Sequence, residues 1–303
     1  MIRDYSAFVP GAGATKRAYT FLEQLGWGPD FAQQIDAGDL SETPPVRIVA
    51  VHRNGLQVVG EKIDETLPPG PEATVGDWLL LNAAQPRLSR VLERKSLLMR
   101  RAPGTDRQVQ LIAANIDTVF IVTSCNQDFN VARLERYLAL AFEAGIEPVI
   151  VLTKADLIDD PQTFIEAAQS VSNRVSVIAL DARGEEPVAA LADWCRPGQT
   201  IAFLGSSGVG KSTLTNALLG KLAIATQGIR EDDARGRHTT TRRELHLIPG
   251  GCLVLDTPGM RELQLAGAAD GIADVFEDID ALAGQCRFND CQHDTEPSCR
   301  VQQ

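Results

Sequence analysis

The sequence has no long hydrophobic run. Of its 303 residues, 44% are hydrophobic and 23% are charged, and no stretch approaches the ~18 consecutive apolar residues that a membrane span requires. The first ten residues, MIRDYSAFVP, lack the basic and then apolar regions of a secretory signal. We therefore expect a globular protein of the cytoplasm with no membrane partner, and the length suggests about two domains.

Aromatic residues and positive charge are also scarce. Aromatic residues make up 5% of the chain, and 40 acidic residues outnumber 29 Lys and Arg, for a net charge of −11. This balance argues weakly against a nonspecific nucleic-acid coat, although a local basic stripe can still bind RNA. The six cysteines of a cytoplasmic chain are expected to be thiols or metal ligands rather than disulfides.

The first third of the chain divides into two parts. Residues 1–45 are interpreted as an N-terminal arm or linker. Residues 46–107 contain short β-type runs, VRIVAVH and LQVVGEK around Asn54-Gly55 and then GDWLLL, and Asn-Gly between such runs is typical of a hairpin turn. Several short strands predict a small β-barrel of the OB type, a fold that often binds nucleic acid.

The end of this β-rich part is basic. The positive residues are Arg87, Arg90, Arg94, Lys95, Arg100, Arg101 and Arg107. They form either a solvated face or a surface that contacts RNA. Trp78 is the one aromatic residue in this part, so contact with the phosphates of folded RNA is favoured over base stacking on a single strand.

Residues 108–262 are predicted to form an α/β domain. The apolar runs TVFIVTS, PVIVLTKAD, RVSVIAL and QTIAFLG alternate with segments of helical spacing. Such alternation indicates a parallel sheet that binds ligands at the carboxyl ends of its strands.

The stretch GSSGVGKST matches the phosphate-loop pattern G-x-x-x-x-G-K-[ST]. Backbone N–H groups of such a loop surround nucleotide phosphates, Lys211 neutralises them and Ser212 binds Mg²⁺. The alternative, a glycine turn before a helix, is disfavoured because a strand precedes the loop and a helix follows it. The expected nucleotide contacts are Gly205, Ser206, Ser207, Gly208, Val209, Gly210, Lys211, Ser212 and Thr213.

Two further motifs complete a nucleotide site. Asp256-Thr257-Pro258-Gly259 at a strand end is expected to sense Mg²⁺ through Asp256 and the γ-phosphate through the N–H of Gly259, although DTPG alone could be a turn. Thr153-Lys154-Ala155-Asp156 is expected to bind the base, because a carboxylate accepts from the N1–H and 2-amino groups of guanine and adenine lacks both donors. Asp156 therefore favours GTP over ATP, with a capping aspartate in a turn as the alternative.

The order of these motifs is unusual, because TKAD precedes the phosphate loop. In an ordinary GTPase the base-binding motif follows the phosphate loop and the DTPG segment. The usual motif also begins with asparagine, so Thr153 leaves one supporting hydrogen bond in question. The order predicts a circularly permuted P-loop GTPase domain.

Four potential metal ligands lie near the end of the chain. Cys286, Cys291, His293 and Cys299 follow the spacing C-x4-C-x-H-x5-C, and three thiolates with one imidazole suit tetrahedral Zn²⁺. Unligated thiols or a redox pair are the alternatives. The remaining cysteines, Cys125, Cys195 and Cys252, lie in or beside apolar segments and are expected to be core residues.

These motifs, with GRHTTT at 236–241, resemble the ribosome small-subunit-dependent GTPases of the RsgA, or YjeQ, type over roughly residues 46–303. The resemblance implies an OB domain, a permuted GTPase domain and a zinc-binding helical element at 263–303. It further implies action on the 30S subunit, through 16S rRNA and small-subunit proteins, late in subunit maturation. We expect a monomer that uses GTP or GDP, Mg²⁺ and Zn²⁺.

The resemblance also assigns finer details. Thr239 to Thr241 would be switch I, with Thr240 preferred as the Mg²⁺ ligand. The loop that supports guanine, Ser-Ala in the family, is placed at Leu180-Asp181. Family members normally continue with helices beyond the last cysteine, so the zinc-binding element is expected to be truncated.

Hydrolysis is expected to be slow without a partner. Met260 follows DTPG, where many GTPases carry a glutamine that orients water, and a thioether cannot do so. Partner stimulation reaches ~10³ to 10⁵ in comparable GTPases. His238 is a candidate for placing the water, or else an exposed histidine without a catalytic role. The rival functions are a GTP-regulated RNA-binding or scaffolding factor with incidental hydrolysis, and an ATPase.

Overall fold

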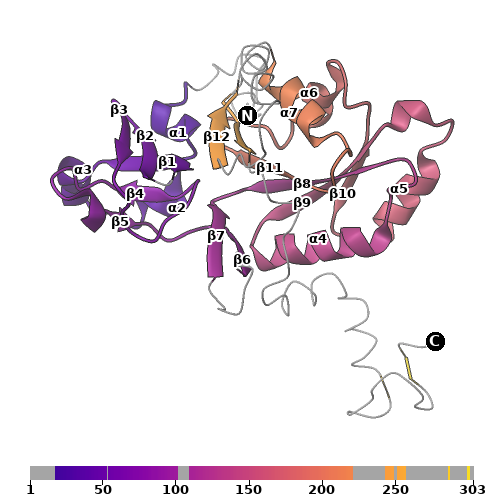
Figure 1. The fold of residues 1–303 in the computed structure, drawn as a ribbon, viewed down its shortest axis with the longest axis horizontal. Helices are drawn as coiled ribbons and strands as arrows, with labels where there is room; N and C mark the ends of the chain where they lie inside the picture. The colour runs from indigo at the N-terminus through magenta and orange to yellow at the C-terminus, as the bar shows by residue number, and fades with distance from the viewer. Residues whose placement is uncertain are drawn as a thin grey trace, which may run out of the picture.

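The structure, a computed structural model, describes residues 18–52, 54–101, 109–220, 243–248, 251–256, 286, 299 and 300. One half of the molecule, with β8 to β11 on the right in Figure 1, contains the strands β8 (Thr118–Ser124), β9 (Glu147–Thr153), β10 (Ser176–Ala179), β11 (Thr200–Leu204), β12 (Arg243–Leu247) and β13 (Leu253–Asp256). Its helices there are α4 (Val131–Glu143), α5 (Gln162–Gln169), α6 (Glu186–Ala190) and α7 (Lys211–Leu219). No helix in the described ranges is both long and apolar enough to cross a membrane.

The sheet of this half is parallel except for its last strand. Its spatial order is β10-β9-β8-β11-β13-β12, and only β12 runs antiparallel to its neighbour β13. β11, which comes fourth along the chain, therefore lies between β8 and β13. The register pairs Phe203 of β11 with Phe120 of β8, and Ala202 of β11 with Leu255 of β13.

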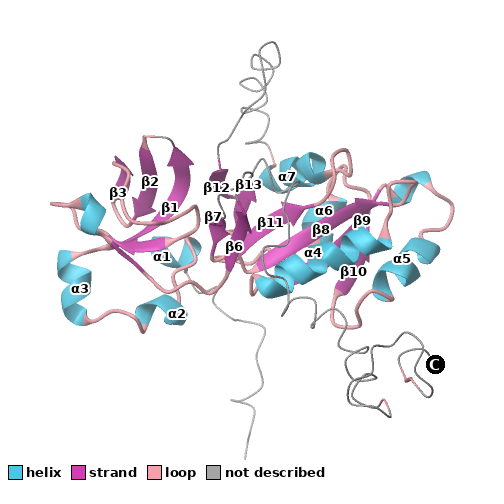
Figure 2. Ribbon diagram, turned by 60° about the horizontal axis from the view of Figure 1, so that its bottom comes forward, coloured by secondary structure: helices cyan, strands magenta, loops and turns pink. Residues whose placement is uncertain are grey.

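Helices cover both faces of the sheet, α4 and α5 one face and α6 and α7 the other (Figure 2). Successive residues of a strand point to opposite faces, and β8 is apolar on both. Val119 and Ile121 lie in the core cluster that includes α4, whereas Phe120 and Val122 lie in the cluster that includes α7. This continuous burial explains why the strand is an unbroken apolar run.

The left half of Figure 1 contains antiparallel strands. They are β1 (Pro45–His52), β2 (Gly55–Gly60), β3 (Ile63–Leu67), β4 (Trp78–Leu80) and β5 (Arg90–Val91), with the 3₁₀ helix η2 (Pro86–Leu88) between β4 and β5. β1 pairs with both β2 and β4, β2 with β3, and β4 with β5. The predicted hairpin is present, but His52 pairs with Gly55, so the connection is residues 53–54 and Gly55 belongs to the strand.

Residues before β1, predicted as an arm or linker, form the short helices α1 (Phe21–Gln24), α2 (Pro29–Ala32) and α3 (Ala37–Glu42). They pack on the β-rich part through aromatic rings. The ring centroids of Trp27 and Trp78 are 4.9 Å apart, and those of Phe31 and Trp78 are 5.8 Å apart. Trp78 is fully buried, so its ring is not available for stacking on a nucleic-acid base.

The two halves share one sheet, because β1 pairs with β12 at Ala50↔Glu244 and Val51↔Arg243. A separate two-stranded sheet, β6 (Leu97–Arg101) with β7 (Val109–Ala114), follows β5 along the chain. A buried arginine, Arg47 of β1, also joins the halves: it donates to the carbonyl of Asn115 (3.1 Å) and to the hydroxyl of Thr200 (2.9 Å). Residues predicted to belong to different domains are thus directly connected.

Candidate nucleotide-binding site

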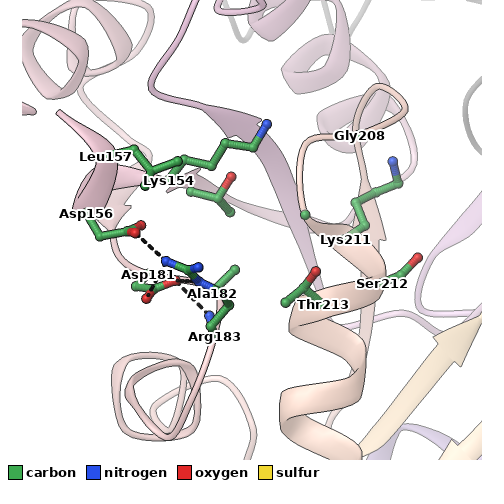
Figure 3. A pocket seen from close by; sticks show the side chains of 12 residues that line it. Lys154, Asp156, Leu157, Asp181, Ala182, Arg183, Gly208, Lys211, Ser212 and Thr213 are labelled. Carbon is green, nitrogen blue, oxygen red and sulfur yellow. Dashed lines mark hydrogen bonds and ion pairs between the residues drawn. The ribbon is translucent and has the colours of Figure 1, made fainter.

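A cavity of about 360 Å³ lies at the carboxyl ends of the parallel strands (Figure 3). Cavities of this size accommodate small-molecule ligands. Its walls come from the end of β9 with the following 3₁₀ helix η3 (Ala155–Leu157), the loop after β10, and the loop before α7 with the first turn of that helix. The lining residues are Thr153, Lys154, Asp156, Leu157, Asp181, Ala182, Arg183, Gly208, Gly210, Lys211, Ser212 and Thr213.

The loop between β11 and α7 has the backbone that a phosphate-binding loop needs. Gly205, Gly208 and Gly210 have φ of +146°, +79° and +101°, values that favour glycine. A Cβ on Gly205 would lie 2.2 Å from the carbonyl oxygen of Val122, so no side chain fits there. The loop is anchored by Val209, which is buried in the core.

Two cations contact this loop. The ammonium of Lys211 donates to the carbonyl of Gly205 at 2.7 Å and also to the carbonyl of Ser206. The guanidinium of Arg133, near the start of α4, donates to the hydroxyl of Ser206 at 2.6 Å. Positive charge is therefore concentrated where phosphates would enter. Arg133 was not identified from the sequence, since no motif marks it.

Thr153 ties the base-binding segment to the phosphate loop. Its buried hydroxyl lies 2.6 Å from the carbonyl of Val209 and 3.1 Å from the carbonyl of Thr123. One hydroxyl proton serves one of these acceptors at a time. Thus threonine at this position still bonds across to the phosphate loop, even though the usual motif has asparagine.

Asp156 lies across the cavity from Lys211 and forms an ion pair with Arg183. The Nη2 of Arg183 is 2.5 Å from Oδ2 of Asp156, and its Nε is 3.1 Å from Oδ1 of Asp181 (Figure 3). Hydrogen bonds from the backbone N–H and then the side chain of Arg183 lower the pKa of Asp181, and the bond to Asp181 raises the pKa of Arg183. One guanidinium therefore pairs with two carboxylates on this wall.

Of the two residues predicted for the guanine-supporting loop, Leu180 and Asp181, only Asp181 lines the cavity. Leu180 is buried in the core, and the loop that lines the cavity is Asp181, Ala182 and Arg183. Leu180, which directly follows β10, packs in the core cluster that includes α7, and a sequence pattern alone did not reveal this. The tripeptide Asp-Ala-Arg before a glycine was the available signal for the correct position.

Two of the residues predicted to bind Mg²⁺, Ser212 and Asp256, belong to the described part of the chain. Ser212 lines the cavity, and Asp256 ends β13, which runs parallel to β11, the strand that leads into the phosphate loop. Both therefore belong to the same edge of the sheet. His238, Thr240 and Gly259 lie outside the described residues.

The predicted zinc ligands are only partly described. The backbone N–H of Arg300 donates to the sulfur of Cys286 at 3.4 Å, and Cys299 is buried, whereas Cys291 and His293 lie outside the described residues. Over the part of the chain that the structure describes, no cluster of His, Cys, Asp or Glu could hold a metal ion. Of the other cysteines, Cys125 and Cys252 are buried in the core as predicted, and Cys195 is partly buried.

The chain matches known proteins over most of its length. Residues 91–266 match the family model RsgA GTPase. The chain is 53% identical to the small ribosomal subunit biogenesis GTPase RsgA 2 of Vibrio vulnificus, covering 95% of this chain and 83% of that protein. It is 49% identical to the small ribosomal subunit biogenesis GTPase RsgA of Mesorhizobium japonicum, covering 93% and 83%.

Two solved structures have a similar fold. YjeQ from Thermotoga maritima superposes with a TM-score of 0.60 at 24% identity, covering 85% of this chain and 89% of that one. YloQ, described as a circularly permuted GTPase, superposes with a TM-score of 0.55 at 27% identity, covering 86% and 87%. The permuted strand order, the phosphate loop and these matches agree. The chain belongs to the RsgA GTPase family and is a GTP hydrolase of circularly permuted fold.

Proposed function

We propose that the protein binds the 30S ribosomal subunit in the cytoplasm and couples GTP hydrolysis to a late step of its maturation. The relatives named above are small ribosomal subunit biogenesis GTPases, which supports this substrate and partner. The observation that carries the proposal is that Asp156 and the phosphate loop line one cavity. Asp156 is the group that would select guanine, because its carboxylate accepts from both donors of that base.

The remaining nucleotide contacts follow from the same geometry. The N–H groups of the glycine-rich loop and the ammonium of Lys211 would bind the phosphates. Ser212, Asp256 and Thr240 would hold Mg²⁺, which supplies charge neutralisation between the β- and γ-phosphates. Gly259 would contact the γ-phosphate through its N–H. Thr153 would keep the base and phosphate contacts in register through its hydrogen bond to the phosphate loop.

Slow intrinsic hydrolysis is part of the proposal, since Met260 replaces a residue that can orient water. His238 would then place the attacking water once the 30S subunit orders its segment. Stimulation by a partner is worth about 10³ to 10⁵ in related chemistry, or roughly 4 to 7 kcal/mol of activation free energy.

We propose that residues 46–107 form the OB-type domain, 108–262 the GTPase domain and 263–303 the zinc-binding element. Pairing of β1 with both β2 and β4 supports a small curled barrel. The N–H···S bond from Arg300 to Cys286 and the donor set of three thiols and one imidazole fit a Zn²⁺ site. Zinc measured by atomic emission in the purified chain should fall when Cys286 is changed to serine.

The positive residues at the end of the β-rich part, Arg87 to Arg107, are here called the basic stripe. We propose that the basic stripe contributes less to RNA binding than its number of charges suggests. Three of its members form internal ion pairs, Arg90–Asp39 at 2.9 Å, Arg94–Asp77 at 2.7 Å and Lys95–Asp117 at 2.6 Å. These pairs join segments of this chain, so their charge is already compensated. We therefore assign phosphate contact to Arg87, which is exposed on η2.

GTP turnover measured with and without purified 30S subunits tests the proposal. We expect a large acceleration by 30S subunits in the wild type and its loss in His238→Ala. Wild-type rates in His238→Ala at saturating 30S would remove the histidine from the mechanism. No acceleration of the wild type would instead support a GTP-regulated RNA-binding or scaffolding factor with incidental hydrolysis.

A further inference from the structure

The carboxylate proposed to bind guanine already has a partner within the chain. Arg183 donates from Nη2 to Oδ2 of Asp156 at 2.5 Å. The same guanidinium donates from Nε to Asp181 at 3.1 Å, and the backbone N–H of Arg183 donates to Asp181 at 2.9 Å. Arg183 thus bridges two acidic residues on one wall of the cavity (Figure 3).

The guanidinium resembles the edge of guanine that Asp156 would bind. Guanine presents an N1–H and a 2-amino N–H on either side of one carbon, and a guanidinium presents the same N–C–N arrangement of donors. Both suit the paired oxygens of a carboxylate. Guanine therefore cannot form its full contact with Asp156 while Arg183 occupies Oδ2.

We propose that Arg183 is an intramolecular competitor of the guanine base for Asp156. Arg183 binds the Asp156 carboxylate and is displaced from it when the guanine base binds. The proposal rests on the base-binding role of Asp156 proposed above and adds a residue that sets nucleotide affinity.

The surroundings of Arg183 allow this exchange. Its side chain is 67% exposed, so little packing holds it in place. When Asp156 is taken by a base, Arg183 still has Asp181 as a partner. The next residue, Gly184, has φ of +78° and open space around its Cβ position, so no neighbouring side chain packs against the backbone there.

The competition lowers affinity by a modest factor. An exposed ion pair of this kind typically changes an equilibrium constant by about 1.5- to 5-fold. Because Arg183 competes with the base for Asp156, it favours release of GDP after hydrolysis.

The test compares Arg183→Gln with the wild type in GDP binding, measured by titration calorimetry of the full chain. We expect the variant to bind GDP about 1.5- to 5-fold more tightly at low salt, and the difference to shrink near 1 M salt, where charge screening is strong. Arg196→Gln is the matched control: Arg196 is 69% exposed and pairs with Asp193 at 3.6 Å, away from the cavity. It should leave GDP binding unchanged.

A second background separates this proposal from the function on which it rests. In Asp156→Asn, which should bind xanthosine diphosphate, Arg183 keeps Asp181 but has lost the carboxylate for which it competes with the base, so Arg183→Gln should no longer tighten nucleotide binding. If Asp156→Asn shows the shift to xanthine but Arg183→Gln has unchanged or weaker GDP affinity, Arg183 is not a competitor. If the shift itself is absent, Asp156 does not bind the base, and both proposals are wrong.

Discussion

Two arginines of the described chain lie among aspartates in opposite surroundings. Arg47 is 1% exposed and donates to Gly76, Asn115, Thr200 and Leu25. Burial lowers its pKa to about 10, although Asp117 and Asp77 counteract the shift. Arg183 is exposed at the rim of the cavity, and its hydrogen bond to Asp181 raises its pKa.

The difference shows that burial decides whether an arginine side chain fixes the structure or can exchange its partners. Even at a pKa of about 10, Arg47 is charged at neutral pH. If its side chain moved away, buried carbonyl groups would lose their hydrogen-bond donor. Arg47 therefore holds β1 against β11, the strand that leads to the phosphate loop. Arg183 loses little by changing partners, which suits a residue that a ligand displaces.

The largest expected effect is on the buried side of this comparison. Arg47→Met should lower the free energy of unfolding by about 3 to 5 kcal/mol, because it leaves buried acceptors without donors. Urea unfolding followed by circular dichroism measures it. Arg87→Met, at an exposed site, is the control and should stay within about 0.5 kcal/mol of the wild type. If Arg47→Met lowered the free energy of unfolding by less than about 1 kcal/mol, the buried arginine would not be more important for stability than an exposed one.

Lys211→Ala should lower kcat for GTP by about 10²- to 10³-fold, the usual cost of removing one preorganised charge-stabilising donor. Stability should change little, because Lys211 is near the surface of the cavity. Single-turnover hydrolysis gives the rate, and an unfolding curve provides the control. An unaffected rate would mean that the cavity is not the site of hydrolysis.

Thr153→Val should cost about 1 to 3 kcal/mol of unfolding free energy, because a buried carbonyl of Val209 or Thr123 loses its donor. GDP affinity should fall as well, since the phosphate loop and the base-binding segment lose their connection. Thr153→Ser keeps the hydroxyl and should retain most of the GDP affinity. Equal affinities in the two variants would show that the hydroxyl does not support the site.

The smallest effect is expected at an exposed pair that joins α3 to β5. Arg90 and Asp39 are 2.9 Å apart with side chains 51% and 31% exposed. Arg90→Gln should change the free energy of unfolding by less than about 1 kcal/mol, and by still less at high salt. A loss comparable to that of Arg47→Met would show that exposure does not separate the two classes.

The sequence was most informative where local pattern and chemistry coincide. The predicted strand TVFIVTS is β8, and the segment of helical spacing that follows it contains α4, because both have strong apolar patterns. The phosphate loop and the permuted strand order followed from motifs and their order. β3, by contrast, went undetected because IDETL is largely polar and exposed.

Several side-chain partners in the site and in the basic stripe could not be predicted, because they lie far away in the sequence. Arg94 finds Asp77, and Lys95 finds Asp117, partners that no local pattern indicates. Arg47 was taken as one residue of a strand, although its side chain connects segments distant in sequence. The burial of Leu180 has the same origin, since it packs against residues that are distant in sequence.

The central claim, that Asp156 in this cavity selects guanine, is tested most directly by competition of GDP, XDP and ADP for the wild type and Asp156→Asn. The wild type should prefer GDP, and the variant should prefer XDP, because an asparagine amide can donate to the 2-oxo group of xanthine while accepting from N1–H. ADP should compete poorly with both. Unchanged preference for GDP in Asp156→Asn would contradict the account.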